Sequence, residues 1–245
     1  MAKHTGLLDV KGTLGGLSFY SSVFGNLVRR KGGPSKALIK KHPNFERMRE
    51  HQAEFANCAM AGKLFRQSLK VFTVQAPDYS LVWRVTQVMN QIKDLDLNSK
   101  RGKRTVAKGI NSAAGKELLK NFELNGKAAL KKVLKRKYTV ETNSLKIMAL
   151  VPKRDLLAPK GATHVKLSFI ALRIDFENKT AVAENKSVEL ALSKNQVDVV
   201  LKPIIPKGSG QLIFLLQLKF EQAVNGKQYV LEDKSGNTLS VVELN

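Results

Sequence analysis

Three short segments of this sequence gather many of the side chains that could bind a phosphate. They span residues 29–41, 100–108 and 127–137, and each is rich in lysine and arginine. Ammonium and guanidinium groups bind phosphate oxygens through charge-assisted hydrogen bonds, and the glycines of "RRKGG" and "KRGKR" let the backbone approach closely. This pattern is typical of proteins that bind the backbone of RNA or DNA. The residues predicted to do so are Arg29, Arg30, Lys31, Lys36, Lys40, Lys41, Lys100, Arg101, Lys103, Arg104, Lys108, Lys131, Lys132, Lys135, Arg136 and Lys137.

The positive charge is unevenly distributed along the chain. The 245 residues carry a formal net charge of +22, and residues 1–150 hold 29 Lys and Arg against 10 Asp and Glu. Residues 151–245 hold 13 basic and 10 acidic residues. So much charge of one sign repels itself unless a polyanion neutralises it. We therefore expect the first 150 residues to meet a nucleic acid, RNA or DNA, through phosphate contacts that do not read its base sequence.

Motifs for catalysis or cofactor binding are weak. The glycine-rich "KGTLGG" lacks the G-x-x-x-x-G-K-[ST] spacing of a phosphate-binding loop. Neither the single cysteine, Cys58, nor the four histidines show a metal-ligand spacing. The carboxylate pairs Asp175 with Glu177 and Glu232 with Asp233 fall beside predicted strand ends, where we interpret them as solvated. The histidines are His4, His42, His51 and His164. The sequence predicts a protein that is not an enzyme, with no catalytic residue, metal, cofactor or small-molecule substrate.

Apolar spacing predicts helices between residues 44 and 137. In residues 45–72 apolar side chains recur every three or four positions, as on one face of a long helix that Asn44 would cap. Residues 81–95 repeat the pattern, and we expect these two helices to pack as an antiparallel hairpin. A third helix follows, weakened or split by Gly109 and Gly115, and a short fourth helix carries the last basic segment, with Leu130, Val133 and Leu134 facing inward. The inward stripe of the first helix is predicted to be Phe45, Met48, Phe55, Ala59, Gly62, Phe65, Leu69 and Phe72.

After Tyr138 the pattern changes to short strands. Alternating side chains in "QLIFLLQLKF" and an Asn-Gly turn at residue 225 are typical of antiparallel hairpins. Seven strands at this spacing predict an Ig-like or jelly-roll-like antiparallel β-sandwich. The expected fold is therefore α+β, with a β-hairpin arm (1–43), a basic helical domain (44–137) and a β-sandwich domain (138–245). The expected strands are 139–150, 164–176, 180–192, 196–204, 211–222, 226–232 and 237–244.

The N-terminal "KGTLGGLSFYSSVFGNLVRRKGG", residues 11–33, predicts a β-hairpin that turns near Gly25 and Asn26. An isolated two-stranded hairpin is marginal in water, so this one must lie on another surface. In one interpretation its aromatic residues pack on the helices and its basic residues are a solvated face. In the other it is an arm that reaches a partner. The residues predicted to join that partner are Leu17, Phe19, Tyr20 and Phe24.

Several blocks of the sequence resemble, in their order, those of a family of uncharacterised bacterial proteins of about this length. The blocks are "KGTLGGLSFY", "LVRRKGG", "NFERMREHQAEF", "AGKLFR", "RGKRTVAKGI", "AAGKELLKNFELNGKAAL", "GATHVKL" and "NGKQYVL". The resemblance covers nearly the whole chain. It implies no activity, ligand or catalytic residue. Because members of that family are nearer to neutral, it also implies that the heavy basic charge is particular to this protein.

Two functions stay open on the sequence. In the first, the protein is a non-enzymatic structural or binding protein on RNA or DNA, for example on a ribonucleoprotein such as the ribosome. Its hairpin and helices would hold the polyanion, and its β-sandwich would make protein contacts. In the second, it is a self-assembling component of a phage-like particle, shell or fibre, whose N-terminal arm adds a strand to a neighbour's sheet. The sequence shows no signal peptide and no run long enough to cross a bilayer, so we expect a cytoplasmic protein with no membrane partner.

Overall fold

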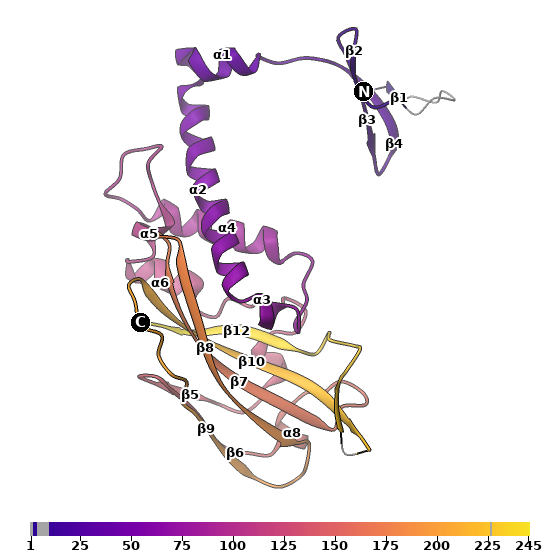
Figure 1. The fold of residues 1–245 in the computed structure, drawn as a ribbon, viewed down its shortest axis with the longest axis vertical. Helices are drawn as coiled ribbons and strands as arrows, with labels where there is room; N and C mark the ends of the chain where they lie inside the picture. Colours follow the sequence, from indigo (N-terminus) through magenta and orange to yellow (C-terminus); the bar gives the residue numbers. More distant parts are fainter. Residues whose placement is uncertain (1, 4–9, 226) are drawn as a thin grey trace. The chain divides into compact units, whose positions relative to one another are not determined.

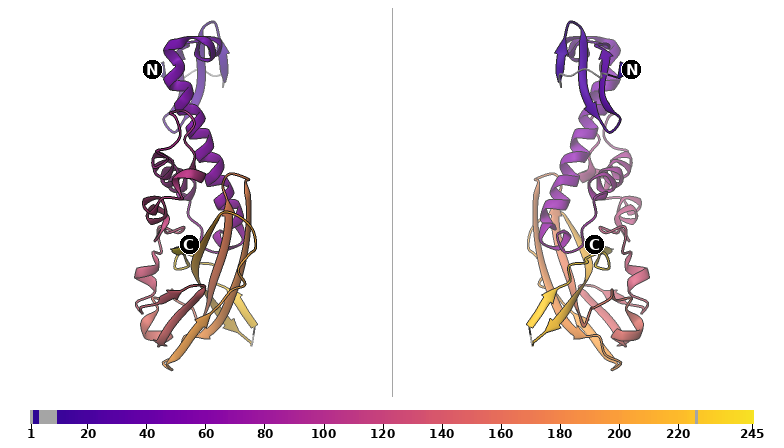
Figure 2. Two further views of the ribbon diagram at one scale, coloured as in Figure 1. Left: turned by 90° about the vertical axis from the view of Figure 1, so that its left-hand side faces the viewer. Right: turned by 90° about the vertical axis from the view of Figure 1, so that its right-hand side faces the viewer.

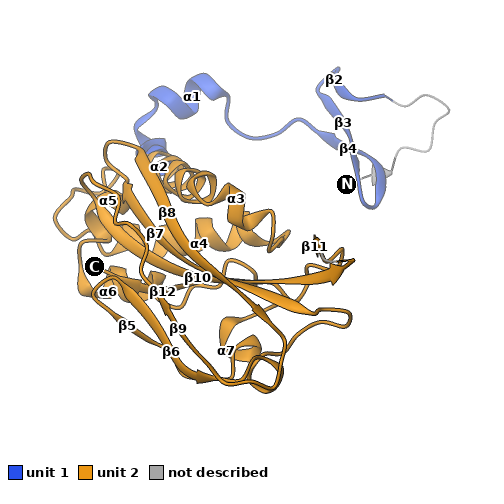
Figure 3. Cartoon of the chain, turned by 60° about the horizontal axis from the view of Figure 1, so that its bottom comes forward, with its two compact units in different colours: residues 1–49 blue, residues 50–245 orange. Residues whose placement is uncertain are grey.

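The computed structural model describes residues 2–3, 10–225 and 227–245, so His4 lies outside the described residues. The chain divides into two compact units, residues 1–49 and residues 50–245 (Figure 3). The structure combines helices with antiparallel sheets, which confirms the mixed α and β composition expected from the sequence. Within the described residues, every helix is too short or too polar to traverse a bilayer.

Unit 1, residues 1–49, contains a four-stranded antiparallel sheet in the order β1-β4-β3-β2. Its strands are β1 (Ala2–Lys3), β2 (Gly12–Leu14), β3 (Leu17–Ser22) and β4 (Gly25–Arg30). Strands β3 and β4 form the predicted hairpin, in which Phe19 lies opposite Val28 and Tyr20 opposite Leu27. The hairpin is therefore not isolated, because β1 and β2 extend it on both sides.

The rest of unit 1 is the short helix α1 (Lys36–Lys41), a 3-10 turn (Pro43–Phe45) and the start of α2 (Glu46–Ser68). The Ser35 hydroxyl caps α1 by accepting a hydrogen bond from the Leu38 N–H. The prediction that Asn44 caps the long helix is wrong, because Asn44 lies within the 3-10 turn and its N–H donates to His42. Between residues 10 and 49, where the structure describes burial, no residue of unit 1 is buried.

The helices of unit 2, residues 50–245, begin with the predicted antiparallel pair. The remaining helices are α3 (Lys70–Thr73), α4 (Leu81–Asp94), α5 (Val106–Gly109), α6 (Ala113–Leu119), α7 (Leu130–Val133) and α8 (Pro152–Asp155). Helices α2 and α4 run in opposite directions, since the Glu54 carboxylate binds Lys93 while Gly62, two turns along, lies against Val85. Midway, the Cys58 thiol faces the carbonyl of Met89 at 3.7 Å. The predicted helical hairpin is thus confirmed.

Two predictions about helix faces and lengths are wrong. Phe55 and Met48 are exposed, whereas Gly62 and Phe65 are buried as predicted. Glu54, Cys58 and Ala61, which were not in the predicted stripe, complete the buried face of α2. The charged Glu54 can face inward because its carboxylate is bound by Lys93, Arg104 and the Gly102 N–H. The fourth helix is a single turn, since Leu134 leaves it to form a β-bridge with Leu156. The third helix is split into α5 and α6, as its two glycines indicated.

Unit 2 contains two antiparallel sheets. The first has five strands in the order β11-β10-β7-β8, with β12 also paired to β10, and it curls into a half-barrel (Figure 1). The second has three strands in the order β5-β6-β9. The strands are β5 (Thr139–Glu141), β6 (Ser144–Leu150), β7 (His164–Asp175), β8 (Thr180–Ala191), β9 (Val197–Leu201), β10 (Gln211–Val224), β11 (Lys227–Val230) and β12 (Thr238–Leu244). Each expected strand region contains at least one of these strands.

The five-stranded sheet is covered on both faces. On one face Ile213 and Leu215 pack in a core with the buried residues of α2 and α4. On the other, Phe214 and Leu216 pack in a second core with the three-stranded sheet and α7. The long strands run beside the helices in both side views (Figure 2). The helices and the three-stranded sheet therefore pack on opposite faces of one sheet. The boundary between the two compact units lies between residues 49 and 50, and residue 137 falls inside unit 2.

Candidate nucleic-acid interface

The last of the three basic segments forms a fixed ridge on unit 2. We call the side chains of Lys131, Lys132, Lys135, Arg136 and Lys137 the basic ridge. Leu130, Val133 and Leu134, which alternate with these side chains along the sequence, were predicted to face inward and are buried in the second core. The backbone is also held, because the Lys135 N–H donates to the carbonyl of Asp155 at 2.9 Å and the Leu157 N–H donates to that of Val133 at 2.8 Å. The four lysines are exposed and Arg136 is half-buried.

The basic ridge is bordered by two open hollows. One, of about 480 Å³, is lined by Lys135, Arg136, Lys137, Thr139, Lys146 and Met148. The other, of about 410 Å³, is lined by Lys131, Leu134, Lys135, Arg136, Lys137, Tyr138 and Thr139. The Arg136 guanidinium donates to the carbonyl of Met148 at 2.9 Å, which places its charge at strand β6. Hollows with such walls are suited to an anionic group such as a phosphate.

The ridge lysines make no ion pair with the described carboxylates. The sequence has no Asp or Glu between residues 124 and 140. Among the described residues, no carboxylate oxygen lies within 4.0 Å of the amino groups of Lys131, Lys132, Lys135 or Lys137. Lys146, which the ridge gains from β6, is paired with Glu141 at 2.6 Å. Four ridge lysines thus keep their charge available for a partner.

Glu123 lies beneath the first turn of α7. Its Oε1 accepts a hydrogen bond from the Leu130 N–H at 3.0 Å. Burial raises the pKa of this carboxyl to about 7, against the opposing influence of that N–H and of the Arg84 and Lys131 charges. Near neutral pH Glu123 therefore exchanges a proton, so the charge near the base of the ridge depends on pH.

In the middle basic segment, the two arginines are paired with carboxylates of the chain itself. Arg101 lies 3.2 Å from the Glu50 carboxylate, and Arg104 lies 3.4 Å from that of Glu54. Burial alone would raise the pKa of Glu54, but hydrogen bonds from Lys93 and the Gly102 N–H outweigh it and hold that pKa below its ordinary value. These two arginines therefore stabilise the loop onto α2. The exposed residues of this segment are Lys100, Arg101, Lys103 and Lys108, the last donating to the Ser99 hydroxyl at 3.0 Å.

The first basic segment belongs to unit 1. Arg29 and Arg30 are exposed near the end of β4, and the Arg29 guanidinium lies 5.6 Å from the ring centre of Tyr20. The Lys31 N–H donates to the carbonyl of Gly16 at 2.6 Å. Lys36, Lys40 and Lys41 are exposed on α1. Of the predicted arm residues, Phe24 is 76% exposed and Leu17 40%, while Phe19 and Tyr20 are half-buried.

Several basic residues near the ridge were not among the predicted sites. Lys127 and Lys160 line a third hollow, of about 330 Å³, together with Lys132 and the acidic Asp233. Lys146 could have been found from the alternation of β6, in which buried Leu145 and Ile147 flank it. Nothing in the sequence indicates Lys160, because it reaches the ridge only through the fold.

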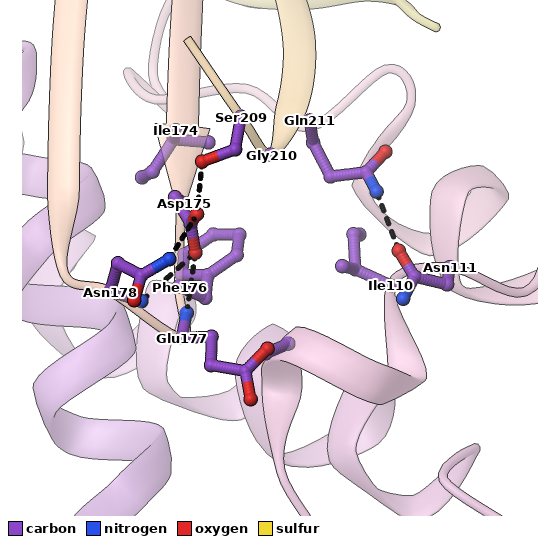
Figure 4. Close-up of a pocket in the computed structure, with 11 residues that line it drawn as sticks. Ile110, Asn111, Ile174, Asp175, Phe176, Glu177, Asn178, Ser209, Gly210 and Gln211 are labelled. Carbon is purple, nitrogen blue, oxygen red and sulfur yellow. Dashed lines mark hydrogen bonds between the residues drawn. The ribbon is translucent and has the colours of Figure 1, made fainter.

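A separate polar hollow of about 430 Å³ contains Asp175 (Figure 4). The expectation that this carboxylate is solvated is wrong. It is buried, and it accepts hydrogen bonds from the Ser209 hydroxyl, from the N–H groups of Glu177 and Asn178, and from the Asn178 side-chain amide. These bonds hold its pKa well below its usual range. An acceptor so fully used anchors the β7–β8 turn and is poorly suited to act as a general base.

Other reactive groups lie apart from one another. Cys58 is buried, and burial raises the pKa of its thiol to about 11. His51 contacts Arg101, and His164 contacts the Thr163 hydroxyl. In the described part of the chain, no group of three or more His, Cys, Asp or Glu residues could hold a metal ion.

Comparison with known proteins gives no assignment for this site. No family model matches the sequence, and neither the curated proteins nor the solved structures contain a match.

Proposed function

We propose that this protein is a non-enzymatic binding protein that docks on the phosphate backbone of a nucleic acid. The basic ridge makes the central contacts, and unit 1 contributes a second basic surface on the same polyanion. The first 49 residues contain ten Lys and Arg against two Asp and Glu. Both surfaces are suited to the repeated phosphates of a nucleic-acid backbone.

The observation that carries this proposal is the placement of the four ridge lysines. They are exposed along a seven-residue stretch whose backbone is held by buried leucine and valine side chains. Lysines placed in this way are spared part of the ordering cost of binding, because the chain beneath them is already fixed. A solvated basic face would serve solubility alone, and the +22 net charge exceeds what solubility requires.

The test is a fluorescence-anisotropy titration with labelled RNA and DNA 30-mers at 50 and 200 mM salt. We expect the wild-type affinity to fall about a thousandfold between these salt concentrations if roughly six phosphates are engaged. The variant Lys131→Gln, Lys132→Gln, Lys135→Gln, Lys137→Gln should bind about 10- to 100-fold more weakly at 50 mM salt. Its plot of log affinity against log salt should also be less steep.

The matched control removes four exposed lysines elsewhere in unit 2: Lys63→Gln, Lys186→Gln, Lys194→Gln and Lys207→Gln. It lowers the net charge equally, so it measures the effect of charge alone. Equal losses of affinity in the two variants would contradict the proposal, as would a wild-type protein that retards neither RNA nor DNA.

A second candidate function, self-assembly through unit 1, is favoured by a different observation. Phe24 and its neighbour Val23 are 76% and 94% exposed at the β3–β4 turn, and no described residue from 10 to 49 is buried. Such a sheet gains stability when a partner covers it. If a neighbouring copy does so, deleting residues 1–33 should convert large particles into monomers by light scattering. An unchanged size distribution would count against assembly.

The strand-rich half of unit 2 is assigned to protein contacts under both functions. We propose that it is an antiparallel β-sandwich, Ig-like or jelly-roll-like in arrangement. The shared core of the five-stranded and three-stranded sheets supports this description. Strand β8 pairs with β7 and is half-buried or exposed along its length, so it offers an outer edge for a protein partner.

A further inference from the structure

Beside the basic ridge, an aromatic side chain stands out from the surface of unit 2. Tyr79, in the turn that precedes α4, is 97% exposed. The Lys127 amino group lies over its ring, 5.9 Å from the ring centre. Lys127 also lines the third hollow, together with the ridge residue Lys132. The Tyr79–Lys127 pair therefore adjoins the basic ridge.

The backbone that carries this pair is fixed by one carboxylate. Asp78 accepts hydrogen bonds from the Ser80 N–H at 2.7 Å and from the Gly126 N–H at 2.9 Å. These two bonds connect the turn that carries Tyr79 to Gly126, the residue before Lys127. Burial alone would raise the pKa of Asp78, but these donors, the Ser80 hydroxyl and Arg84 hold it well below its usual range. The carboxylate is therefore charged near neutral pH, and the tyrosine and the lysine are held side by side.

We propose that Tyr79 is a stacking platform for an unpaired base, and that the polyanion bound by the ridge is single-stranded. This inference rests on the proposed function. Proteins that bind single strands combine a basic track for the backbone with aromatic rings on which bases stack. In a duplex the bases are stacked on each other and have no free face for the ring. Lys127 would hold the adjoining phosphate while the base covers Tyr79.

The test compares three 20-mer DNA probes with equal numbers of phosphates per strand. They are a mixed-sequence single strand, the same strand in a duplex, and a single strand of abasic tetrahydrofuran sites. Wild-type protein should bind the base-bearing strand about 5- to 100-fold more tightly than the abasic strand. Tyr79→Ala should lose that advantage and bind the abasic strand and the duplex as the wild type does. Tyr79→Phe, which keeps the ring, should retain it.

Tyr229→Ala is the matched control, because Tyr229 is also exposed (53%) and lies on β11. It should bind all three probes as the wild type does. If the wild type prefers the base-bearing strand no more than the abasic one, or if Tyr79→Ala weakens both equally, the stacking inference is overturned and the proposed function stands. If the wild type binds none of the probes at 50 mM salt, both fall together.

Discussion

Arg84 and Asp78 form an ion pair that ties the start of α4 to the segment leading into the basic ridge. The Arg84 guanidinium also donates to the carbonyl of Glu123 at 2.6 Å and to that of Leu124 at 3.0 Å. The side chain of Asp78 is only 5% exposed. One arginine thus satisfies a buried carboxylate and two backbone carbonyls from a distant part of the sequence.

We expect Arg84→Ala to lower the free energy of unfolding by about 2–4 kcal/mol, because it removes the charged partner of the buried Asp78 carboxylate and the donor to two backbone carbonyls. Urea denaturation measures the loss. Arg154→Ala is the control, since the Arg154 side chain is 65% exposed and its partner Asp155 keeps the Val151 N–H as a donor, so its removal should shift the midpoint far less. Similar midpoints for the two variants would contradict this account.

The raised pKa of Glu123 predicts a pH-dependent contribution to stability. Because the folded-state pKa is about 7 and the ordinary value is 4.5, the folded protein binds the proton more tightly than the unfolded chain does. The contribution is therefore fully present below pH 4.5 and is lost as the pH rises toward 7. We expect Glu123→Gln to remove this dependence, so the variant should gain about 1–3 kcal/mol relative to wild type between pH 5 and pH 8.

The measurement for Glu123 is the difference in unfolding free energy between variant and wild type at the two pH values. Taking a difference cancels the titration of all other groups that the two proteins share. A difference that is the same at pH 5 and pH 8 would show that Glu123 does not titrate in this range.

Gly109 is required by a close approach between α5 and α4. A Cβ atom at this position would lie 1.9 Å from the carbonyl oxygen of Ile92, so the two helices would have to separate. We expect Gly109→Ala to destabilise unit 2 by about 3 kcal/mol or more, as for an overpacked core. Thermal unfolding followed by circular dichroism gives the change.

Gly62→Ala provides a graded control for Gly109. Its Cβ would meet a side-chain methyl of Val85 at 3.1 Å, which can move by a few tenths of an ångström. The gain in helix propensity, about 1 kcal/mol, offsets part of the strain. We expect a much smaller change than for Gly109→Ala, and equal losses would contradict the backbone-contact explanation.

Residues 138–245 should not fold as a separate domain. Without the helices, the face of the five-stranded sheet that carries Ile213, Leu215 and Val241 would be exposed to water. We expect this fragment to aggregate or to lack a cooperative unfolding transition, whereas residues 50–245 should fold as a monomer. Size-exclusion chromatography and thermal unfolding of both fragments test this, and a stable monomer of 138–245 would contradict it.

The strands were the most predictable part of the fold. Their side chains alternate, and turn residues such as Asn225 separate them, so local sequence was sufficient. Which sheet each strand joins was not predictable, because β10 is apolar on both faces and its sequence does not say whether a helix or a sheet covers each one. The inward position of Glu54 was also hidden, since its partners lie about 40 to 50 residues away.

In the candidate site, the local pattern of the ridge was predictable from the sequence, but the contacts between distant segments were not. The segment of alternating apolar and basic residues after Ala129 correctly indicated that Leu130 and Val133 face inward and the lysines outward. The ion pairs of Arg101 and Arg104 depend on α2 lying against their loop, which sequence spacing cannot show. Likewise the meeting of Tyr79 with Lys127 requires the fold of unit 2.

The sheet of unit 1 has no buried side chain among its described residues from 10 to 49, and this bears on its thermal stability. In most proteins the burial of apolar side chains is the main source of thermal stability, and the side chains of this sheet in that range are at most half-buried. If unit 1 binds nucleic acid as proposed, its melting temperature should depend strongly on the nucleic acid present and rise with the logarithm of the ratio of free ligand concentration to Kd.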